Sequence, residues 1–354
     1  MKMTSQAFEE YGEDLVEISK EAPQPKGREV LIEVHHCGVC HSDIHLHDGY
    51  FGLGGDRKLD VRAGRELPFT LGHEIEGSIA AVGPDVDAAE GLEIGARRVV
   101  FPWIGCDECD TCKAGRGHLC NKPRQLGINV QGGYATHVLV PDAKYVLPYD
   151  GIPQDIAGSY MCSGVTAFSA LKKLDRRAPE GPVLIVGLGG VGMMGLAFAQ
   201  ALYDSPVYAA DIDEGKLNLA ESSGAVATFN SSDADAIKAF KKATGGGAAA
   251  AVDFAGTTGS FNFAQSCLRK GGKVVVAGLM GGEFSTPLAF LPMRAIAIEG
   301  SFVGSFEETK EMLEIVKAGK VKPIPVATRP LCEANGALND LREGKVVGRV
   351  VLTA

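Results

Sequence analysis

The sequence predicts an α/β protein that combines a mostly-β domain with a doubly wound parallel-sheet domain, and three observations support this. Its 354 residues exceed the size at which a single hydrophobic core usually stops growing. Up to about residue 150, short strand-like runs alternate with turn residues, whereas from about residue 155 apolar strands alternate with helix-length segments. The first of these later strands leads directly into a glycine-rich turn.

The amino-terminal part is expected to form an all-β, barrel-like unit. Apolar runs of strand length occur at residues 29–34, 76–82, 97–101 and 135–140, with Gly, Pro and Asp between them. Several short strands at such close spacing are typical of all-β sandwiches and barrels.

The later part is expected to form βαβ units. Its strand-like runs lie at residues 183–186, 207–211, 227–230, 250–254 and 273–279. Their alternation with helices predicts a parallel sheet that is covered on both faces. A further strand is expected near residues 298–302. The remaining tail is too short for a third core, so we expect it to pack back on the first domain.

Composition argues against several kinds of partner and location. The 44 acidic and 35 basic residues leave a formal charge of −9, whereas nucleic acids and anionic membranes require a basic face. The uncharged stretch 181–203 has the length of a membrane span, but its clustered glycines favour strand, turn and helix. No signal peptide is visible, so nine cysteines indicate metal binding or catalysis in the cytoplasm rather than disulfides.

The glycine-rich turn has the context of a dinucleotide-binding site. A strand at Val183–Val186 runs into Gly187, Gly189 and Gly192, and a helix is expected to follow. The three glycines allow the tight turn, the close approach of a pyrophosphate and close helix–strand packing, and the helix N-terminus offers free N–H groups to phosphate.

An acidic residue supports NAD rather than NADP as the dinucleotide. Asp211 lies 19 residues past Gly192, at the end of the second strand of the unit. A carboxylate at this place bonds the ribose hydroxyls of NAD and repels the extra phosphate of NADP. Asp213 is the alternative candidate for this role.

Four cysteines within 15 residues predict a metal site. Cys106, Cys109, Cys112 and Cys120 form a ligand set typical of a closed, tetrahedral structural zinc. Closely spaced cysteines also hold iron–sulfur clusters, which is the alternative interpretation. Nothing around the motif suggests electron transfer, so zinc is favoured.

A second group of metal-binding residue types is dispersed. The candidates are Cys37 and Cys40 with His45 and His47, then His73 beside Glu74, and finally Cys162. A Cys₂His set on zinc would leave the fourth position open for a reactant. Taken singly, Cys162 is equally consistent with a small buried hydrophobic residue, and His73 with a hydrogen-bonded core histidine.

Six motifs together resemble the zinc-dependent medium-chain dehydrogenase/reductase family, in its alcohol dehydrogenase branch. They are Cys40-His-Ser-Asp43, Gly72-His-Glu74, the four-cysteine cluster, Cys162-Ser-Gly-Val-Thr166, the turn from Gly187 to Gly192, and Gly348-Arg349.

The resemblance covers essentially the whole chain and implies two domains. The first is a GroES-like catalytic domain made of residues 1–155 and 296–354, with a structural-zinc lobe at about residues 103–122. The second is a Rossmann NAD-binding domain at residues 156–295.

The resemblance also implies the roles of the site residues. Cys40, His73 and Cys162 would bind the catalytic zinc, with Asp43 supporting the site and Glu74 as a nearby carboxylate. The implied proton path consists of Ser42, which holds the substrate hydroxyl, and His45, which passes the proton to solvent.

The implied cofactor site surrounds the pyrophosphate, the ribose and the nicotinamide. His41 and Arg349 match positions at the pyrophosphate, Thr166 and Val191 match positions beside the nicotinamide, and Lys216 matches a position at the ribose. The complete expected set is His41, Thr166, Gly187, Gly189, Gly190, Val191, Gly192, Asp211, Lys216 and Arg349.

The expected function is therefore reversible hydride transfer between a primary or secondary alcohol and NAD, with two zinc ions per chain. A polyol or other carbonyl-specific dehydrogenase of the same family is the nearest alternative. A sensor that binds zinc and nucleotide without turnover is disfavoured by the Ser42/His45 pair. A zinc-free quinone or enoyl reductase is disfavoured by the three catalytic ligands. No nucleic acid or membrane partner is expected, and the resemblance implies a homo-oligomer, either a tetramer or a dimer.

One segment departs from the family pattern. The chain between Cys40 and His73 is longer than the resemblance leads us to expect, and the extra residues lie at about 52–65. They follow Phe51, which matches a position near the substrate channel. This segment is expected either to reshape the pocket entrance or to form a solvated surface loop. Trp103, the only tryptophan, is a candidate pocket wall, with ordinary core packing as the alternative.

Overall fold

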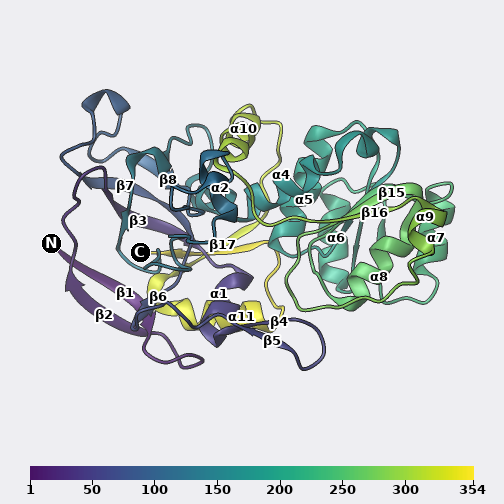
Figure 1. The fold of residues 1–354 in the computed structure, drawn as a ribbon, viewed down its shortest axis with the longest axis horizontal. Helices are drawn as coiled ribbons and strands as arrows, with labels where there is room; N and C mark the ends of the chain where they lie inside the picture. Colours follow the sequence, from purple (N-terminus) through teal and green to yellow (C-terminus); the bar gives the residue numbers. More distant parts are fainter.

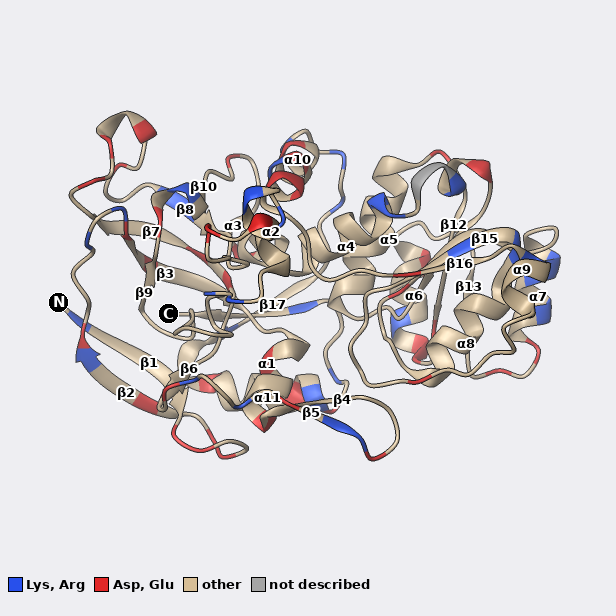
Figure 2. Ribbon diagram, viewed as in Figure 1, with Lys and Arg blue, Asp and Glu red and all other residues tan. Residues whose placement is uncertain are grey.

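The computed structural model describes residues 1–354, except for Asp175 and Arg176, and arranges them as two lobes that lie side by side (Figure 1). One lobe is rich in antiparallel strands and holds both termini, and the other is built on a parallel sheet. Acidic and basic residues alternate around both lobes (Figure 2). Among the described helices, none is long and apolar enough to cross a membrane.

The antiparallel lobe is organised around a seven-stranded sheet. Its strand order is β10-β8-β7-β3-β18-β17, and β9 pairs with β3 beside this path. The strands are β3 (Val30–Gly38), β7 (Glu74–Val82), β8 (Arg97–Val100), β9 (His137–Val140), β10 (Val146–Leu147), β17 (Val326–Pro330) and β18 (Arg349–Thr353). The carboxyl-terminal strand β18 pairs with β3, which returns the end of the chain to this lobe.

Smaller elements surround the seven-stranded sheet. A three-stranded sheet has the order β2-β1-β6, and β4 pairs with β5 as a separate hairpin. These strands are β1 (Lys2–Phe8), β2 (Val16–Glu21), β4 (Tyr50–Gly52), β5 (Lys58–Asp60) and β6 (Phe69–Thr70). The helices before the second lobe are α1 (His41–Asp48), α2 (Asp110–Lys113), α3 (Gln154–Ala157) and α4 (Ser163–Lys172).

The second lobe contains a six-stranded, all-parallel sheet. Its order is β13-β12-β11-β14-β15-β16, so the first strand in sequence lies in the middle and the chain winds outward in both directions. The strands are β11 (Val183–Val186), β12 (Val207–Asp211), β13 (Thr228–Asn230), β14 (Ala248–Asp253), β15 (Leu268–Val276) and β16 (Ala297–Gly300). This is the order of a dinucleotide-binding sheet, whose ligands bind where the winding direction reverses.

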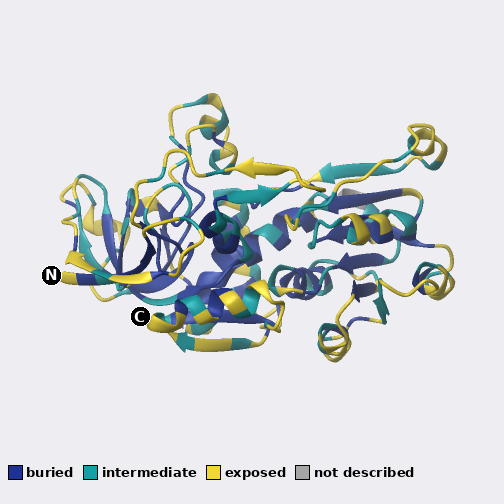
Figure 3. Cartoon of the chain, turned by 90° about the horizontal axis from the view of Figure 1, so that it is seen from below, coloured by how far each residue is buried: buried dark blue, intermediate teal, exposed yellow. Residues whose placement is uncertain are grey.

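Apolar residues explain why this sheet is central. Every residue of β11, β12 and β14 is buried, as expected for strands covered on both faces (Figure 3). The connecting helices are α5 (Gly190–Leu202), α6 (Glu214–Ser222), α7 (Ala236–Ala243), α8 (Thr258–Cys267) and α9 (Phe290–Arg294). The predicted α/β class with a doubly wound parallel sheet is confirmed.

The edge strand β16 extends the parallel sheet to Gly300. It pairs with β15 along its whole length, in the region where the sequence pattern suggested a last strand. The sheet therefore ends five residues beyond residue 295, because β16 continues the ladder before the chain leaves the lobe. Two helices then follow, α10 (Phe306–Lys317) and α11 (Ala334–Arg342).

Candidate active site and metal centres

The start of helix α1 holds the first two residues of the site. Cys40 is the N-cap residue, and the carboxylate of Asp43 accepts a hydrogen bond from its backbone N–H at 2.9 Å. Asp43 thus occupies the capping-box position, so the local sequence Cys-His-Ser-Asp itself dictates this helix start. The sulfur of Cys40 lies at the positive end of the helix, where a thiolate is favoured.

Strand pairing brings the second ligand to the first. Gly38 at the end of β3 pairs with Glu74 at the start of β7, so the residues just beyond these ends, Cys40 and His73, meet at one edge of the sheet. A side chain at Gly38 would not fit, because its Cβ would lie 2.0 Å from a carboxylate oxygen of Glu74.

Cys162 joins the site from the start of another helix. It is the N-cap residue of α4, which places its sulfur at a second helix N-terminus. The next residue, Ser163, donates a hydrogen bond of 2.7 Å to Glu74, which ties α4 to the start of β7.

The predicted catalytic ligands form one compact cluster. Ligand atoms of Cys40, His73, Glu74 and Cys162 all lie within 4.8 Å of one another, and all four residues are buried. The sulfurs of Cys40 and Cys162 are 4.0 Å apart. Two thiolates that bind one tetrahedral zinc at about 2.3 Å lie roughly 3.8 Å apart, so the spacing fits zinc.

An unpaired nitrogen of His73 is further evidence that the cluster fits a zinc ion. Nε2 of His73 is buried and has no hydrogen-bond partner among the described residues. Leaving such a group unpaired costs about 1–3 kcal/mol, which a metal bond would offset. The Cys₂His donor set therefore fits a catalytic zinc with Glu74 beside it.

The thiols and the imidazole influence one another electrostatically. The hydrogen bond between the two thiols lowers the pKa of Cys40 well below its usual value and raises that of Cys162. Burial lowers the pKa of His73, but Asp43 and Cys40 together outweigh burial and raise it well above the usual value. Burial raises the pKa of Glu74.

Asp43 lies beside the imidazole of His73, and Tyr134 holds Asp43. Nδ1 of His73 lies 3.2 Å from Asp43, although the geometry falls short of a well-aligned hydrogen bond. The hydroxyl of Tyr134 donates to the same carboxylate at 2.9 Å. A carboxylate behind a ligating histidine fixes which ring nitrogen faces the metal. Gly72 must be glycine, because a Cβ there would lie 2.4 Å from the Tyr134 ring.

Arg349 connects this cluster with the glycine-rich turn. Its guanidinium donates a hydrogen bond to Glu74, and both side chains are buried. The aliphatic part of the Arg349 side chain lies against the glycine-rich turn. A Cβ on Gly190 would be only 2.5 Å from Cδ of Arg349. Burial lowers the pKa of Arg349, but the charge of Glu74 outweighs it and raises the pKa.

The glycine-rich turn between β11 and α5 has the shape that phosphate binding requires. Gly187 has a φ of +83°, and a Cβ on Gly192 would lie 1.7 Å from the carbonyl oxygen of Gly187. Gly189 faces open space, since a Cβ there would meet nothing within 4 Å. Two of the glycines are thus required by packing, and the third leaves room for a ligand.

The two acidic candidates at the end of β12 have different contacts. Asp211 accepts hydrogen bonds from the backbone N–H of Leu188 in the turn, at 2.6 Å, and of Ile212. Asp213 is the N-cap residue of α6, where it accepts from the N–H of Lys216. Asp213 therefore serves as a helix cap, whereas Asp211 lies beside the glycine-rich turn.

The predicted proton-path residues lie on α1, Ser42 in its first turn and His45 at the start of its second. The Cys40 thiol donates to Oγ of Ser42 at 3.8 Å, which places this hydroxyl at the metal cluster. The His45 ring lies 4.6 Å from the Phe51 ring and 5.9 Å from the His41 ring, centroid to centroid. Burial lowers the pKa of both histidines, and the positive charge of Lys216 contributes at His41.

Trp103 lies against the metal cluster. Its ring packs edge-on against His73 at 5.5 Å and against Phe302 at 6.0 Å, and its Nε1–H donates to the carbonyl of Met161. The residue is almost fully buried, so packing and a position beside the site coincide here.

The four-cysteine cluster forms a second candidate metal centre around α2. The sulfurs lie 3.5 Å apart for Cys109 and Cys112, 3.9 Å for Cys109 and Cys120, and 4.0 Å for Cys106 and Cys112. Backbone N–H groups lower the pKa of Cys106 to about 6, whereas burial raises that of Cys112 to about 12. The closed sulfur set fits the predicted structural zinc.

The remaining predicted residues border the two lobes. Thr166 is in the first turn of α4 and Val191 in the first turn of α5, and these helices pack together.

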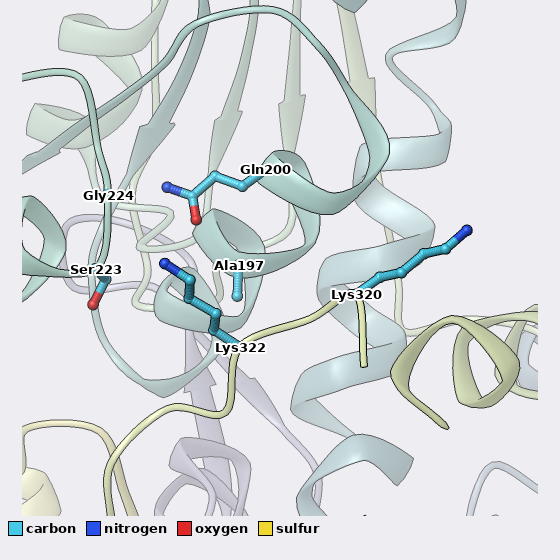
Figure 4. Close-up of a pocket in the computed structure, with 6 residues that line it drawn as sticks. All are labelled: Ala197, Gln200, Ser223, Gly224, Lys320 and Lys322. Carbon is cyan, nitrogen blue, oxygen red and sulfur yellow. The ribbon is translucent and has the colours of Figure 1, made fainter. Parts of the chain in front are cut away.

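A separate hollow of about 320 Å³ is lined by residues from the far half of α5, the end of α6 and the chain after α10 (Figure 4). None of its lining residues belongs to the predicted site.

Comparisons with known proteins agree with this geometry. Residues 26–153 match the alcohol dehydrogenase GroES-like domain, and residues 190–318 match the zinc-binding dehydrogenase domain. An NAD-dependent alcohol dehydrogenase of Sulfurisphaera tokodaii is 36% identical over 96% of this chain and 98% of that protein. The chain belongs to the zinc-dependent medium-chain dehydrogenase family.

Solved structures place this family member in the alcohol dehydrogenase branch. The alcohol dehydrogenase of Aeropyrum pernix superposes with a TM-score of 0.88 at 30% identity, over 99% of this chain and 100% of that one. The acetophenone reductase of Geotrichum candidum, solved with NAD, gives a TM-score of 0.85 at 27% identity, over 100% and 97%. The predicted family, the oxidoreductase class and the cofactors zinc and NAD are confirmed.

Sequence reasoning missed three residues of the site: Tyr134, which holds Asp43; Ser163, which holds Glu74; and Phe302, which packs on Trp103. Ser163 lies within the motif Cys162–Thr166 but was assigned no role, and no local pattern marks Tyr134. Phe302 follows β16 at the carboxyl edge of the parallel sheet, where ligands bind in such folds, and that position was a usable signal.

Proposed function

We propose that this family member oxidises a primary or secondary alcohol to an aldehyde or ketone with NAD, and that it catalyses the reverse reduction. The observation that carries the proposal is the continuous connection from the Cys₂His cluster through Glu74 and Arg349 to the glycine-rich turn. It supports a site where substrate and nicotinamide meet.

The zinc ligands hold the group that activates the substrate. Cys40, His73 and Cys162 would bind zinc, which as a Lewis acid lowers the pKa of an alcohol hydroxyl and polarises a carbonyl. Asp43 holds the imidazole of His73 in the required orientation, and Tyr134 holds Asp43. Glu74 balances the buried charge of Arg349 beside the cluster.

The remaining residues bind cofactor and move a proton. Ser42, whose hydroxyl lies 3.8 Å from the sulfur of Cys40, would accept the proton of the substrate hydroxyl, and His45 would pass it towards solvent. Gly187, Gly189 and Gly192 shape the turn for the pyrophosphate, with positive charge from Arg349 and His41. Thr166 and Val191 would border the nicotinamide, and Asp211 and Lys216 the ribose.

A substrate panel tests the proposed activity. Purified protein assayed with NAD on linear, branched, cyclic and aromatic alcohols and on polyols should show NADH formation with at least one alcohol, and zinc should be measured on the same sample. Preference for polyols would favour the polyol dehydrogenase. Zinc and NAD binding without turnover on any alcohol would favour the sensor, and activity without zinc would favour a zinc-free reductase.

Asp211→Ala is expected to weaken NADH binding about 10- to 100-fold, because hydrogen bonds to a charged group contribute roughly 1.5–3 kcal/mol. Fluorescence titration of NADH measures the effect, and the variant should discriminate less against NADPH than the wild type does. Asp213→Ala is the matched control, which should lower stability by about 1 kcal/mol as a lost helix cap and leave NADH affinity unchanged. An unchanged Kd for NADH in Asp211→Ala contradicts the assignment.

His45→Gln is expected to slow alcohol oxidation on the order of a hundredfold, because a positioned proton carrier is lost. Burial lowers the pKa of His45, so the neutral, accepting form persists to a pH somewhat below about 6.5. The fall of kcat/KM at lower pH should disappear in the variant. The control is His47→Gln on the same helix, whose ring contacts the carbonyl of Glu13. A pH profile identical to that of the wild type rules out the relay.

We further propose a homo-oligomer, either a dimer or a tetramer. The outer edge of β16 carries no strand partner among the described residues, and free edges invite pairing. Large exposed apolar residues cluster in the preceding segment, namely Leu279, Met280, Phe284, Leu288, Phe290 and Met293. Light scattering on the purified protein gives the number of subunits. A monomer at micromolar concentration would contradict the proposal.

The domain division and the cytoplasmic location are also proposed. The expected division was a catalytic domain of residues 1–155 and 296–354 and an NAD-binding domain of residues 156–295. Because β16 (Ala297–Gly300) pairs with β15, we propose that this strand belongs to the NAD-binding domain. All nine cysteines are free thiols, which suits a reducing compartment.

A further inference from the structure

The segment at residues 52–65, which departs from the family pattern, folds as a hairpin rather than as a loose loop. Strand β4 pairs with β5, and the tip between them spans residues 53–57. Backbone bonds close the tip, from the N–H of Leu53 to the carbonyl of Arg57 at 2.9 Å and from the N–H of Arg57 to that of Gly54.

The base of the hairpin is braced on the antiparallel lobe. The N–H of Val61 donates to the carbonyl of Gly49 at 3.0 Å, and the hydroxyl of Tyr11 donates to the carbonyl of Arg62. The ammonium of Lys58 lies 3.7 Å from the centre of the Tyr50 ring, within the hairpin itself. The hairpin is therefore attached to its own lobe through several contacts.

The tip of the same hairpin touches the other lobe. The guanidinium of Arg57 pairs with the carboxylate of Glu283. Backbones also approach closely, because a Cβ on Gly281 would lie 3.0 Å from the carbonyl oxygen of Gly52. A Cβ on Gly54 would likewise lie 3.0 Å from the side chain of Glu283.

The contacted segment is fixed at the ligand-binding edge of the parallel sheet. Thr258, the first residue of α8, exchanges hydrogen bonds of 2.9 and 3.1 Å with the backbone of Glu283. The N–H of Gly282 donates to the carbonyl of Gly256 in the turn after β14. At the hairpin's other end, Phe51 packs against His45 of the proposed proton path. The hairpin thus spans the gap between the two halves of the proposed active site (Figure 1).

We propose that the β4–β5 hairpin is a strap that holds the two lobes together, and that its release from Glu283 limits how fast the nucleotide leaves. This inference rests on the proposed NAD-binding function. Lys58 lies over the Tyr50 ring, Asp60 pairs with Arg62, and Arg57 pairs with Glu283 of the other lobe. These pairings fit a strap better than a binding site for a charged substrate.

The strength of the contact suits a strap that opens in every catalytic cycle. The side chains of Arg57 and Glu283 remain 66% and 58% exposed, so their attraction is screened by water and salt. An exposed pair of this kind changes an equilibrium by roughly 1.5- to 5-fold. Loops that open and close over an active site set the turnover rate in many enzymes.

Arg57→Gln tests the strap directly, with Lys58→Gln as the matched control. Both substitutions remove one positive charge from the same hairpin, but only Arg57 reaches the other lobe. NADH release is followed by stopped-flow fluorescence after displacement with excess NAD, with Trp103 as the energy donor. We expect release to be about 1.5- to 5-fold faster in Arg57→Gln and unchanged in Lys58→Gln.

A charge exchange and a measurement without nucleotide complete the test. The double variant Arg57→Glu/Glu283→Arg should restore the wild-type release rate, and 1 M salt should accelerate release in the wild type but not in Arg57→Gln. Hydrogen exchange of residues 50–60 and 279–284 should be faster in Arg57→Gln, without nucleotide, and not in Lys58→Gln.

Three results would overturn the strap: equal release from both single variants, a charge exchange that restores nothing, or unchanged hydrogen exchange. Failure of the wild type to bind NADH would instead contradict the proposed function, and hydrogen exchange would still decide whether the hairpin is held to the other lobe.

Discussion

His73→Ala is expected to remove the catalytic zinc and to lower kcat by about a thousandfold. The imidazole is the only nitrogen donor in the described cluster, and its removal leaves two thiols and a carboxylate that is already paired with Arg349. Loss of a Lewis acid removes several kcal/mol of transition-state stabilisation, and about 4 kcal/mol corresponds to a thousandfold. Zinc content should fall from two ions per chain to one.

Cys37→Ala is the control for this prediction. Cys37 is buried three residues before Cys40, but its thiol lies outside the ligand cluster and contacts the carbonyl of Gly38. The variant should retain both zinc ions and most of its activity. Elemental analysis and steady-state kinetics on the same samples check both variants. Full zinc content and normal turnover in His73→Ala would show that another set of residues binds the catalytic metal.

Cys112→Ala is expected to empty the second metal centre and to lower the melting temperature on the order of 10 °C. Metal binding contributes about 10–16 kcal/mol to the folding of small zinc domains, so losing even a fraction of that energy would strongly destabilise the four-cysteine segment. Besides its sulfurs, this segment is held to the β-rich core by Asp107, which accepts hydrogen bonds from Tyr145 and Lys144.

The same variant should also lower activity, because the first cysteine of the cluster, Cys106, lies three residues after Trp103, which packs on His73. Thermal unfolding, zinc content and visible absorption should be measured together, since an iron–sulfur cluster would colour the wild type. The control is Cys332→Ala, which removes an exposed thiol outside both clusters. Unchanged zinc content and melting temperature in Cys112→Ala would refute a structural metal.

Sequence motifs predicted the parts of the site whose residues lie close together in the sequence. The four cysteines around α2 and the glycine-rich turn after β11 each lie within one short segment, so spacing alone was sufficient for them. The alternation of apolar strands with helices likewise predicted the parallel sheet, because side-chain periodicity reflects which faces are buried.

The hairpin at residues 52–65 was left open between two interpretations, a reshaped entrance and a solvated loop. Only the position of Glu283 on the other lobe distinguishes them, and no sequence period relates residues that are so far apart. Tyr134 was missed for the same reason, because its partner Asp43 lies 91 positions away.

The sequence by itself therefore determined the fold class, the family resemblance, the structural metal motif and the dinucleotide turn. The tertiary structure decided that Cys40, His73 and Cys162 meet, that Asp211 rather than Asp213 faces the turn, and that Arg349 joins both halves of the site. The physical reason is that a motif within one short segment depends only on the backbone geometry of that segment. Contacts between distant residues arise only when strand pairing and the packing of buried apolar faces bring their segments together.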